Sequence, residues 1–153
     1  MKICAVVAEF NPFHNGHAYL LEKIRNSGYS HIVVIMSGNY VQRGEAAIFP
    51  KDTRAKAALQ MGANLVIELP TVKVLATAEK YAFSALSIIK KLGNQINAIA
   101  FGTETENFEN LIKIKEILRT EIFKKEVKLQ LEKGLSFAVC RETAVKNISN
   151  NPK

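Results

Sequence analysis

The chain has 153 residues, of which 48% are hydrophobic and 23% are charged. These values are typical of a soluble globular domain with a sizeable core; they exclude a disordered chain, and the length excludes two ordinary domains. The formal net charge of +7 favours an anionic partner such as a nucleotide or RNA.

The cysteines and the apolar segments indicate the cellular location of the protein. Cys4 and Cys140 lie far apart without a CxxC spacing, which indicates reduced thiols in a cytoplasmic protein and no metal site. No apolar run approaches the ~20 residues of a membrane span, so we expect no membrane partner. The apolar segment at the N-terminus lacks a cleavage site of small residues, and we expect no signal peptide.

Strand and helix patterns alternate in chain order through the first two thirds of the sequence. Short apolar runs predict buried strands over residues 2–8, 31–36, 65–70 and 98–102. Helical spacing predicts helices over residues 16–27, 53–61 (capped by Asp52) and 76–92, the last with Ala78, Ala82, Ala85 and Ile89 on one face. The stretch 37–50 has no period and reads as a long loop, which is often functional.

The last third predicts helices alone, over residues 108–119, 122–133 and 137–147. From residue 110 onwards the chain carries ten Lys/Arg and five Asp/Glu, and so most of its net charge. A solvated helical face and an RNA-facing surface both explain this excess. The whole pattern predicts one α/β domain over residues 1–153: a parallel sheet covered by helices on both faces, then a basic helical part from about residue 107.

The most informative stretch is EFNPFHNGH, which leaves the first predicted strand and enters the first helix. His14 and His17 are three residues apart, so their imidazoles point the same way on a first helical turn. Gly16 lets the backbone approach a ligand, and a helix N-terminus binds phosphate. Two imidazoles there can donate hydrogen bonds to a reacting α-phosphoryl group and its pyrophosphate leaving group.

These residues resemble the HxGH signature of the nucleotidyltransferase superfamily, whose members are Rossmann-like and attack the α-phosphate of a nucleoside triphosphate. The longer stretches 36–59 (MSGNYVQRGEAAIFPKDTRAKAAL), 66–70 (VIELP) and 101–104 (FGTE) resemble the bacterial tRNA(Met) cytidine acetate ligase family over nearly the whole chain. The resemblance implies that ATP, with Mg²⁺, activates acetate as acetyl-adenylate. The acetyl group then passes to N4 of the wobble cytidine of elongator tRNA(Met).

The resemblance also implies site residues. His14, His17, Arg43 and Arg54 are the candidate catalytic residues, the two arginines because a guanidinium binds triphosphate oxygens in a bidentate fork. Ser37, Gly38 and Asn39, after the second strand, are candidates for the acetate or acceptor pocket. The implied ATP contacts are Val7, Ala8, Glu9, Phe10, Asn11, Pro12, Phe13, His14, Asn15, Gly16, His17, Leu20, Gly102 and Thr103.

Several roles stay open at this point. Phe10 and Phe13 suit an adenine site and a core equally, and Lys51, Glu68 and Arg141 suit structural and functional roles. Family members are longer, so we expect a C-terminal region to complete the site. The motif alone also allows an adenylyltransferase acting on nicotinamide mononucleotide or phosphopantetheine, and a shortened chain allows a non-catalytic nucleotide- or RNA-binding module. The sequence does not determine the oligomeric state.

Overall fold

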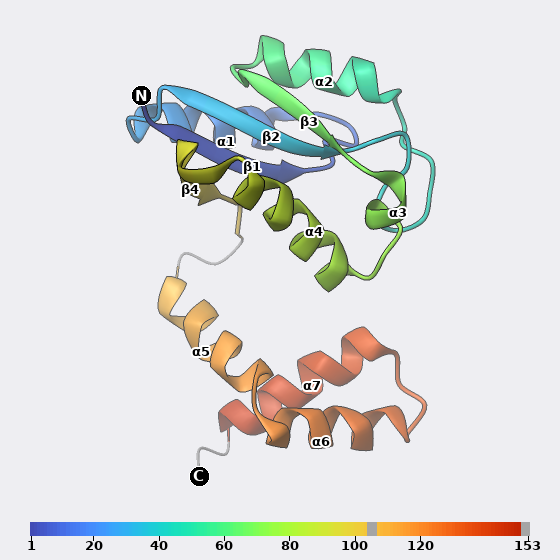
Figure 1. Cartoon of the computed structure of the whole chain (residues 1–153). Coiled ribbons are helices and arrows are strands. Elements are labelled where there is room, and N and C mark those ends of the chain that lie inside the picture. The colour runs from blue at the N-terminus through green and yellow to red at the C-terminus, as the bar shows by residue number, and fades with distance from the viewer. Residues whose placement is uncertain (104–106, 151–153) are drawn as a thin grey trace. The chain divides into compact units, whose positions relative to one another are not determined.

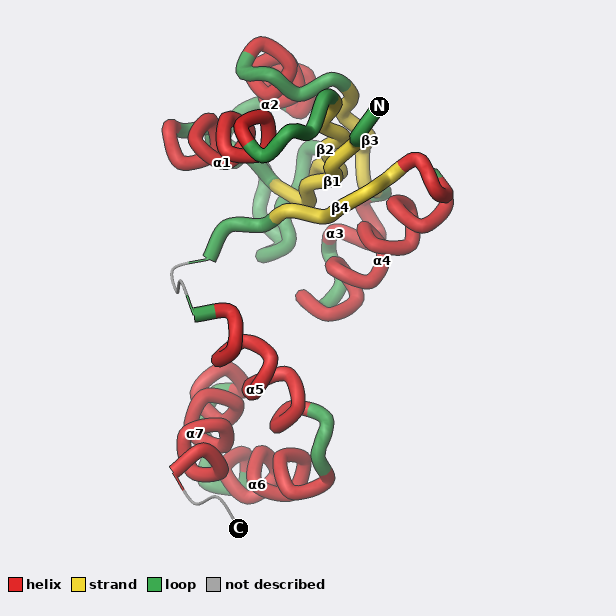
Figure 2. The backbone as a smooth tube through the Cα atoms, turned by 90° about the vertical axis from the view of Figure 1, so that its left-hand side faces the viewer, coloured by secondary structure: helices red, strands yellow, loops and turns green. Residues whose placement is uncertain are grey.

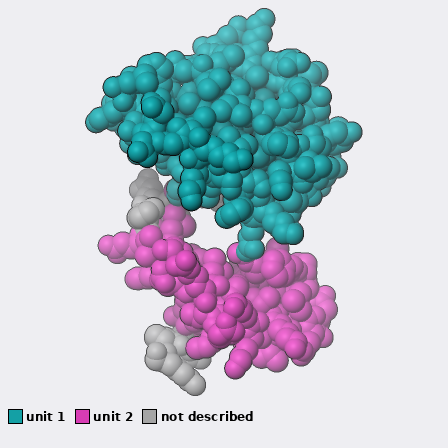
Figure 3. Space-filling view, in the orientation of Figure 1, with its two compact units in different colours: residues 1–102 teal, residues 103–153 magenta. Residues whose placement is uncertain are grey.

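The computed structural model describes residues 1–103 and 107–150, so Glu104 of the FGTE stretch lies outside the described residues. The chain divides into two compact units, Met1–Gly102 and Thr103–Lys153 (Figure 3). Each unit is described by itself below.

The first unit is built on a four-stranded sheet in which every pair of neighbours is parallel (Figure 1). The strands are β1 (Ile3–Ala8), β2 (His31–Ser37), β3 (Leu65–Leu69) and β4 (Ile96–Ala100), in the spatial order β3-β2-β1-β4. This confirms the predicted Rossmann-like α/β fold. The strand order reverses between β1 and β4, and in such sheets the crevice at the carboxyl ends of those strands binds ligands.

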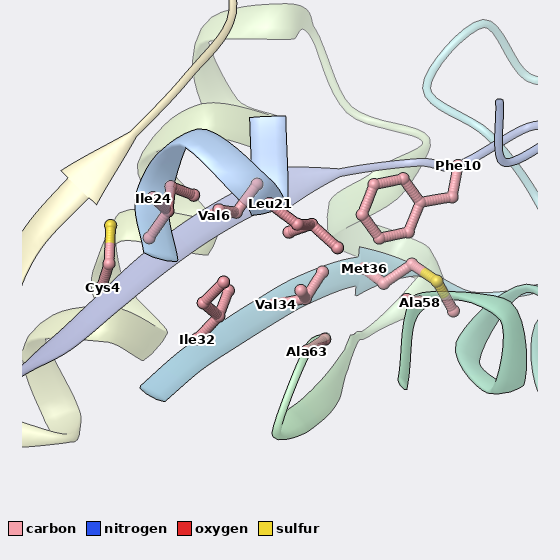
Figure 4. Close-up of a cluster of buried hydrophobic side chains, with 10 residues drawn as sticks. All are labelled: Cys4, Val6, Phe10, Leu21, Ile24, Ile32, Val34, Met36, Ala58 and Ala63. Carbon is pink, nitrogen blue, oxygen red and sulfur yellow. The ribbon is translucent and has the colours of Figure 1, made fainter. Parts of the chain in front are cut away.

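Helices cover both faces of the sheet (Figure 2). Because side chains alternate along a strand, Ile32, Val34 and Met36 of β2 pack with α1 (Asn15–Asn26) and α2 (Lys51–Gln60), as Figure 4 shows around Phe10. Val33 and Ile35 pack on the other face with α3 (Thr71–Val74) and α4 (Ala78–Lys91). The 3-10 turn η1 (Gly93–Gln95) leads into β4.

One local prediction was wrong, and two features of the helices go beyond the sequence pattern. Asp52 does not cap α2, since the helix begins one residue earlier, with Pro50 at the N-cap and no side-chain cap. Thr71–Val74 forms the short helix α3, which four residues are too few to reveal as a period. Of the four residues expected on one face of α4, Ala85 and Ile89 are buried, whereas Ala78 and Ala82, in its first turns, are exposed.

The second unit consists of α5 (Phe108–Leu118), α6 (Glu121–Leu131) and α7 (Phe137–Asn150), as the helical periods predicted. Its core contains Phe123, Val127, Cys140 and Ala144. The ion pairs of α6 and α7 are exposed, so they contribute little stability. Within residues 1–103 and 107–150, no helix has both the length and the apolar character that crossing a membrane requires.

Candidate functional site

The segment after β1, residues 9–14 (the first loop), turns sharply before α1 begins. Phe10 has a φ of 49°, in the left-handed region that non-glycine residues rarely occupy, and the Asn11–Pro12 peptide bond is cis. The Phe10 ring is 1% exposed and packs 4.9 Å from the Phe13 ring and 4.8 Å from the His17 ring, between ring centroids. Both phenylalanines therefore belong to the packing under the turn.

The two histidines cap α1 with their own side chains. His14 is the N-cap, and its Nδ1 accepts a hydrogen bond from the Gly16 N–H over 3.1 Å. The Nδ1 of His17 accepts one from the His14 N–H over 3.2 Å. This is the reciprocal arrangement of a capping box, with imidazoles in place of the usual hydroxyl and carboxylate.

The space at position 16 is limited by the capping ring. A Cβ built on Gly16 would lie 3.0 Å from Cε1 and 3.1 Å from Nδ1 of the His14 ring. The sequence suggested that this glycine gives room to a ligand, and the structure adds that it gives room to the capping imidazole.

The capping bonds define the tautomer of both rings. A backbone N–H can only donate, so each Nδ1 is unprotonated and each neutral ring carries its proton on Nε2. The rings stack with centroids 3.7 Å apart and 26° between their planes. Burial, and secondly the neighbouring His14, lower the pKa of His17 from its ordinary value of 6.5. With Nδ1 engaged in the cap, each ring presents its Nε2–H as a donor.

A cavity of about 730 Å³ opens beside the histidines, within the first unit, and its volume is in the usual range of small-molecule sites. It lies at the carboxyl ends of β1 and β4, where the strand order reverses. Of the residues predicted to form the site, those that line the cavity are Val7, Ala8, Glu9, Phe10, Asn11, Pro12, His14, Gly16, His17, Leu20, Arg43 and Gly102.

Other predicted residues lie elsewhere. Phe13 packs against the Phe10 and His17 rings, and Asn15 is the first, exposed residue of α1. Thr103 belongs to the second unit. None of the three lines the cavity.

Arg54 is also away from the cavity. Its side chain is 1% exposed, and its guanidinium donates to the backbone carbonyls of four residues, Phe49, Glu9, Ser37 and Gly38. Burial lowers the pKa of this guanidinium, and the charge of Glu9 acts in the opposite direction. The sequence placed Arg54 on triphosphate oxygens, whereas its donors are engaged with the chain itself.

The three residues proposed for an acetate pocket differ in what they offer. Ser37 is fully buried, and its Oγ has no hydrogen-bond partner in the described part of the chain. Gly38 lies under the side chain of Glu68, whose Oε1 would be 2.3 Å from a Cβ at that position. The Oδ1 of Asn39 accepts a hydrogen bond from the Lys51 N–H. Of the three, Ser37 is the one with a buried hydroxyl that lacks a partner in the described part of the chain.

Lys51 and Glu68 form an ion pair of 2.6 Å between Nζ and Oε2. The hydrogen bond to Glu68 raises the pKa of Lys51 above its ordinary value. Both side chains are partly exposed, so the pair contributes little to stability. In the second unit, the guanidinium of Arg141 lies 5.7 Å from the centroid of the Phe137 ring, a cation–π distance.

The sequence did not single out three residues that line the cavity: Val41, Glu45 and Phe101. Val41 and Glu45 flank Arg43 in residues 38–50 (the second loop), and Phe101 directly precedes Gly102. Phe101 is 60% exposed. An aromatic residue at the end of a strand, beside a glycine already proposed for ATP, was a signal that could have found it.

The fold and the histidine-capped helix define the class of the protein. The sequence model described as HIGH Nucleotidyl Transferase matches residues 1–153, and the chain belongs to this family.

Curated relatives narrow the comparison. The tRNA(Met) cytidine acetate ligase of Caldanaerobacter subterraneus subsp. tengcongensis is 44% identical over 99% of this chain, and that of Clostridium tetani is 42% identical over 100% of it. The match covers 38% of each relative, so the chain spans about two fifths of their length. The resemblance inferred from the motifs is confirmed.

A solved structure agrees with these relatives. The crystal structure of Thermotoga maritima TmcAL bound with alpha-thio ATP superimposes with a TM-score of 0.84 at 37% identity, over 97% of this chain and 37% of that chain. The similarity supports the fold and the predicted class of ligand.

Proposed function

We propose that this chain belongs to an enzyme that uses ATP to activate acetate as acetyl-adenylate and then acetylates N4 of the wobble cytidine of elongator tRNA(Met). The observation that carries the proposal is the stacked pair of neutral imidazoles at the start of α1, whose Nε2–H donors adjoin the cavity. The relatives' name and the ATP analogue in the Thermotoga maritima structure support the same reaction.

In the first step, an acetate oxygen attacks the α-phosphorus of ATP. The new bond joins that oxygen to phosphorus, the bond between the α-phosphorus and the bridging oxygen breaks, and pyrophosphate leaves with the electron pair. Negative charge builds on the α-phosphoryl oxygens and the leaving group. Hydrogen-bond donors fixed beside that charge lower the barrier, each by about 3–4 kcal/mol when measured by deletion. His14 and His17 are the donors proposed for this role.

The other contacts follow from the shape of the cavity. The first-loop backbone and the N-terminus of α1 suit the phosphates, and Arg43 suits the triphosphate oxygens. Nothing lies within 4 Å of a Cβ built on Gly102, so the space beside it is open to the adenosine. Ser37 does not line the cavity and its Oγ is buried, so its contact with acetate stays a prediction. Phe13, Asn15, Gly38, Asn39 and Thr103 stay predictions.

Mg²⁺ would reach this site with ATP. The described residues contain no group of three or more His, Cys, Asp or Glu placed to hold a metal ion. This suits an ion that proteins usually bind through substrate phosphates and one or two carboxylates. Glu9 and Glu45 are the carboxylates of the cavity, and bound Mg²⁺ would neutralise phosphate charge there.

In the second step, N4 of the cytidine attacks the acetyl carbonyl, the bond from that carbon to the adenylate oxygen breaks, and AMP leaves while N4 loses a proton. The basic second unit suits the RNA phosphates. We propose tRNA binding there, weakened by salt, in a cytoplasmic protein. Charge reversal at Lys124 and Lys128 should lower tRNA affinity; unchanged affinity would contradict this part of the proposal.

The test is incubation of the chain with ATP and labelled acetate, without and with tRNA. We expect acetyl-adenylate and pyrophosphate when ATP and acetate are present without tRNA. When tRNA is added, we expect the label in the tRNA. ATP consumption with nicotinamide mononucleotide or phosphopantetheine but not acetate would identify a different adenylyltransferase. ATP or RNA binding without turnover would identify a non-catalytic module.

A further inference from the structure

The first and second loops are joined by side chains that line or adjoin the cavity. The Gln42 N–H donates to Glu9 Oε1 over 2.6 Å, and the Ile48 N–H donates to Asn11 Oδ1 over 2.7 Å. These bonds connect residues more than thirty positions apart in sequence. Two side chains implied to contact ATP are therefore occupied in holding the second loop.

Arg54 joins the same two loops at their base. One guanidinium nitrogen, NH1, donates to the carbonyls of Glu9 in the first loop and Ser37 at the end of β2, and the other, NH2, donates to Gly38 in the second loop. Its Nε donates to Phe49, near the far end of the second loop. A buried charge is costly unless it is hydrogen-bonded, and these four carbonyls satisfy it. The arrangement fixes where both loops leave the sheet.

The second loop carries Arg43 to the cavity. Val41, which is 3% exposed, anchors the loop in the protein, and Arg43 lines the cavity two residues further on. Within residues 1–103 and 107–150, the guanidinium of Arg43 has no ion-pair or hydrogen-bond partner. It is therefore available to an anion, provided that the loop stays in place.

We infer that Glu9, Asn11 and Arg54 are positioning residues that clamp the second loop to the first and so hold Arg43 at the nucleotide's polyphosphate. The inference rests on the proposed function for the role of Arg43 toward ATP. The clamp itself is a property of the chain and is measurable without substrate.

Matched variants separate the clamp from general packing. Asn11→Ala removes the acceptor of the Ile48 N–H, whereas Asn11→Asp keeps it. Glu9→Ala likewise removes the acceptor of the Gln42 N–H, whereas Glu9→Gln keeps an oxygen that can accept it. Arg54→Met removes the buried charge, and Lys56→Met removes an exposed charge from the same helix. If Arg54→Met does not fold, Asn11→Ala alone tests whether the second loop is clamped to the first.

Amide hydrogen exchange and trypsin digestion measure directly how often the second loop opens. Asn11→Ala should speed exchange of the Ile48 amide about tenfold and leave the amides of β2 unchanged, because opening is confined to the loop. It should also speed trypsin cleavage after Arg43. Asn11→Asp should restore the slow exchange. Unchanged exchange and cleavage in Asn11→Ala would overturn the clamp, whether or not the chain activates acetate.

A double-mutant cycle tests whether the clamp acts through Arg43. ATP affinity, measured by calorimetry without acetate or tRNA, should fall about three- to tenfold in Asn11→Ala, the size of one lost hydrogen bond. The double variant Asn11→Ala/Arg43→Met should bind no more weakly than Arg43→Met alone. Additive losses would show that Asn11 acts independently of Arg43 and would overturn the positioning role. Lys56→Met should bind ATP as the unchanged chain does.

Discussion

The observed cap made by His17 and its proposed role as a hydrogen-bond donor to phosphate can be separated by one pair of substitutions. His17→Ala removes the ring, the Nδ1 acceptor of the His14 N–H and the Nε2–H donor. His17→Gln also removes the ring, but a glutamine at this third helical position supplies an oxygen that accepts the same N–H, as in a standard capping box.

The contacts of His17 allow the loss of stability and of activity to be estimated for each variant. Both lose the ring contact to Phe10, 4.8 Å between centroids, which is worth about 0.5–1.5 kcal/mol of unfolding free energy. Only His17→Ala loses the capping bond, so it should be less stable than His17→Gln by about 1 kcal/mol. His17→Ala leaves no donor at this position, so acetate-dependent exchange of pyrophosphate into ATP should fall about 10²–10³-fold. His17→Gln keeps an amide NH₂ donor, so its loss should be smaller.

Urea denaturation and the exchange assay measure the two effects separately. The control is His31→Gln, a histidine at the start of β2 whose ring contacts Ser30 and does not line the cavity. Near-normal exchange activity in His17→Ala would refute the donor role of the ring. Equal stability of the alanine and glutamine variants would refute the contribution of the capping bond.

Three further predictions concern pH, packing and thiol reactivity. The pKa of His17 is lower in the folded chain than its ordinary value of 6.5, so the unfolded chain takes up a proton at a higher pH than the folded chain. The free energy of unfolding should therefore fall as the pH drops below 6.5 and level off below the folded pKa. Urea denaturation at several pH values should show this slope, and the slope should be smaller in His17→Gln. A Cβ in Gly38→Ala would displace the Glu68 carboxylate, and with it the exposed ion pair to Lys51, so the substitution should lower stability only slightly. The same change in a Glu68→Ala background should cost less, and equal costs would contradict the clash. Cys4 and Cys140 are buried, and burial raises the pKa of Cys4, so a disulfide reagent should label neither thiol until the chain unfolds.

The sequence was sufficient for the sheet and for the turn at the histidines. Short β-branched apolar runs such as residues 31–36 favour a buried strand, and a glycine between two histidines at a strand end restricts the chemistry to few classes. The cap of α1 follows from residues close in sequence, since His14, Gly16 and His17 bond to one another. The strands were found from their own composition, although their partners lie far away in sequence.

Arg54 shows what a local pattern cannot contain. Its neighbours in sequence suggested a charge at the start of a helix, facing solvent or phosphate. Its actual partners are carbonyls of Glu9, Ser37 and Gly38, which the parallel pairing of β1 with β2 brings to one edge of the sheet. Backbone carbonyls carry no signal in the side-chain sequence, so the burial of this arginine follows only from the tertiary structure.

The use of acceptors in the first loop explains why the site suits an anion. Both imidazole Nδ1 atoms accept backbone N–H groups, Glu9 Oε1 accepts from Gln42, and Asn11 Oδ1 accepts from Ile48. The two capping bonds leave each imidazole with its Nε2–H as the free polar group, a donor that suits a phosphate oxygen. The bond from Gln42 engages only Oε1 of Glu9, so this residue stays a carboxylate that would accompany a cation brought by the phosphates. The histidine cap therefore supplies the donors for the anion, while the bonds of Glu9 and Asn11 hold the second loop beside them.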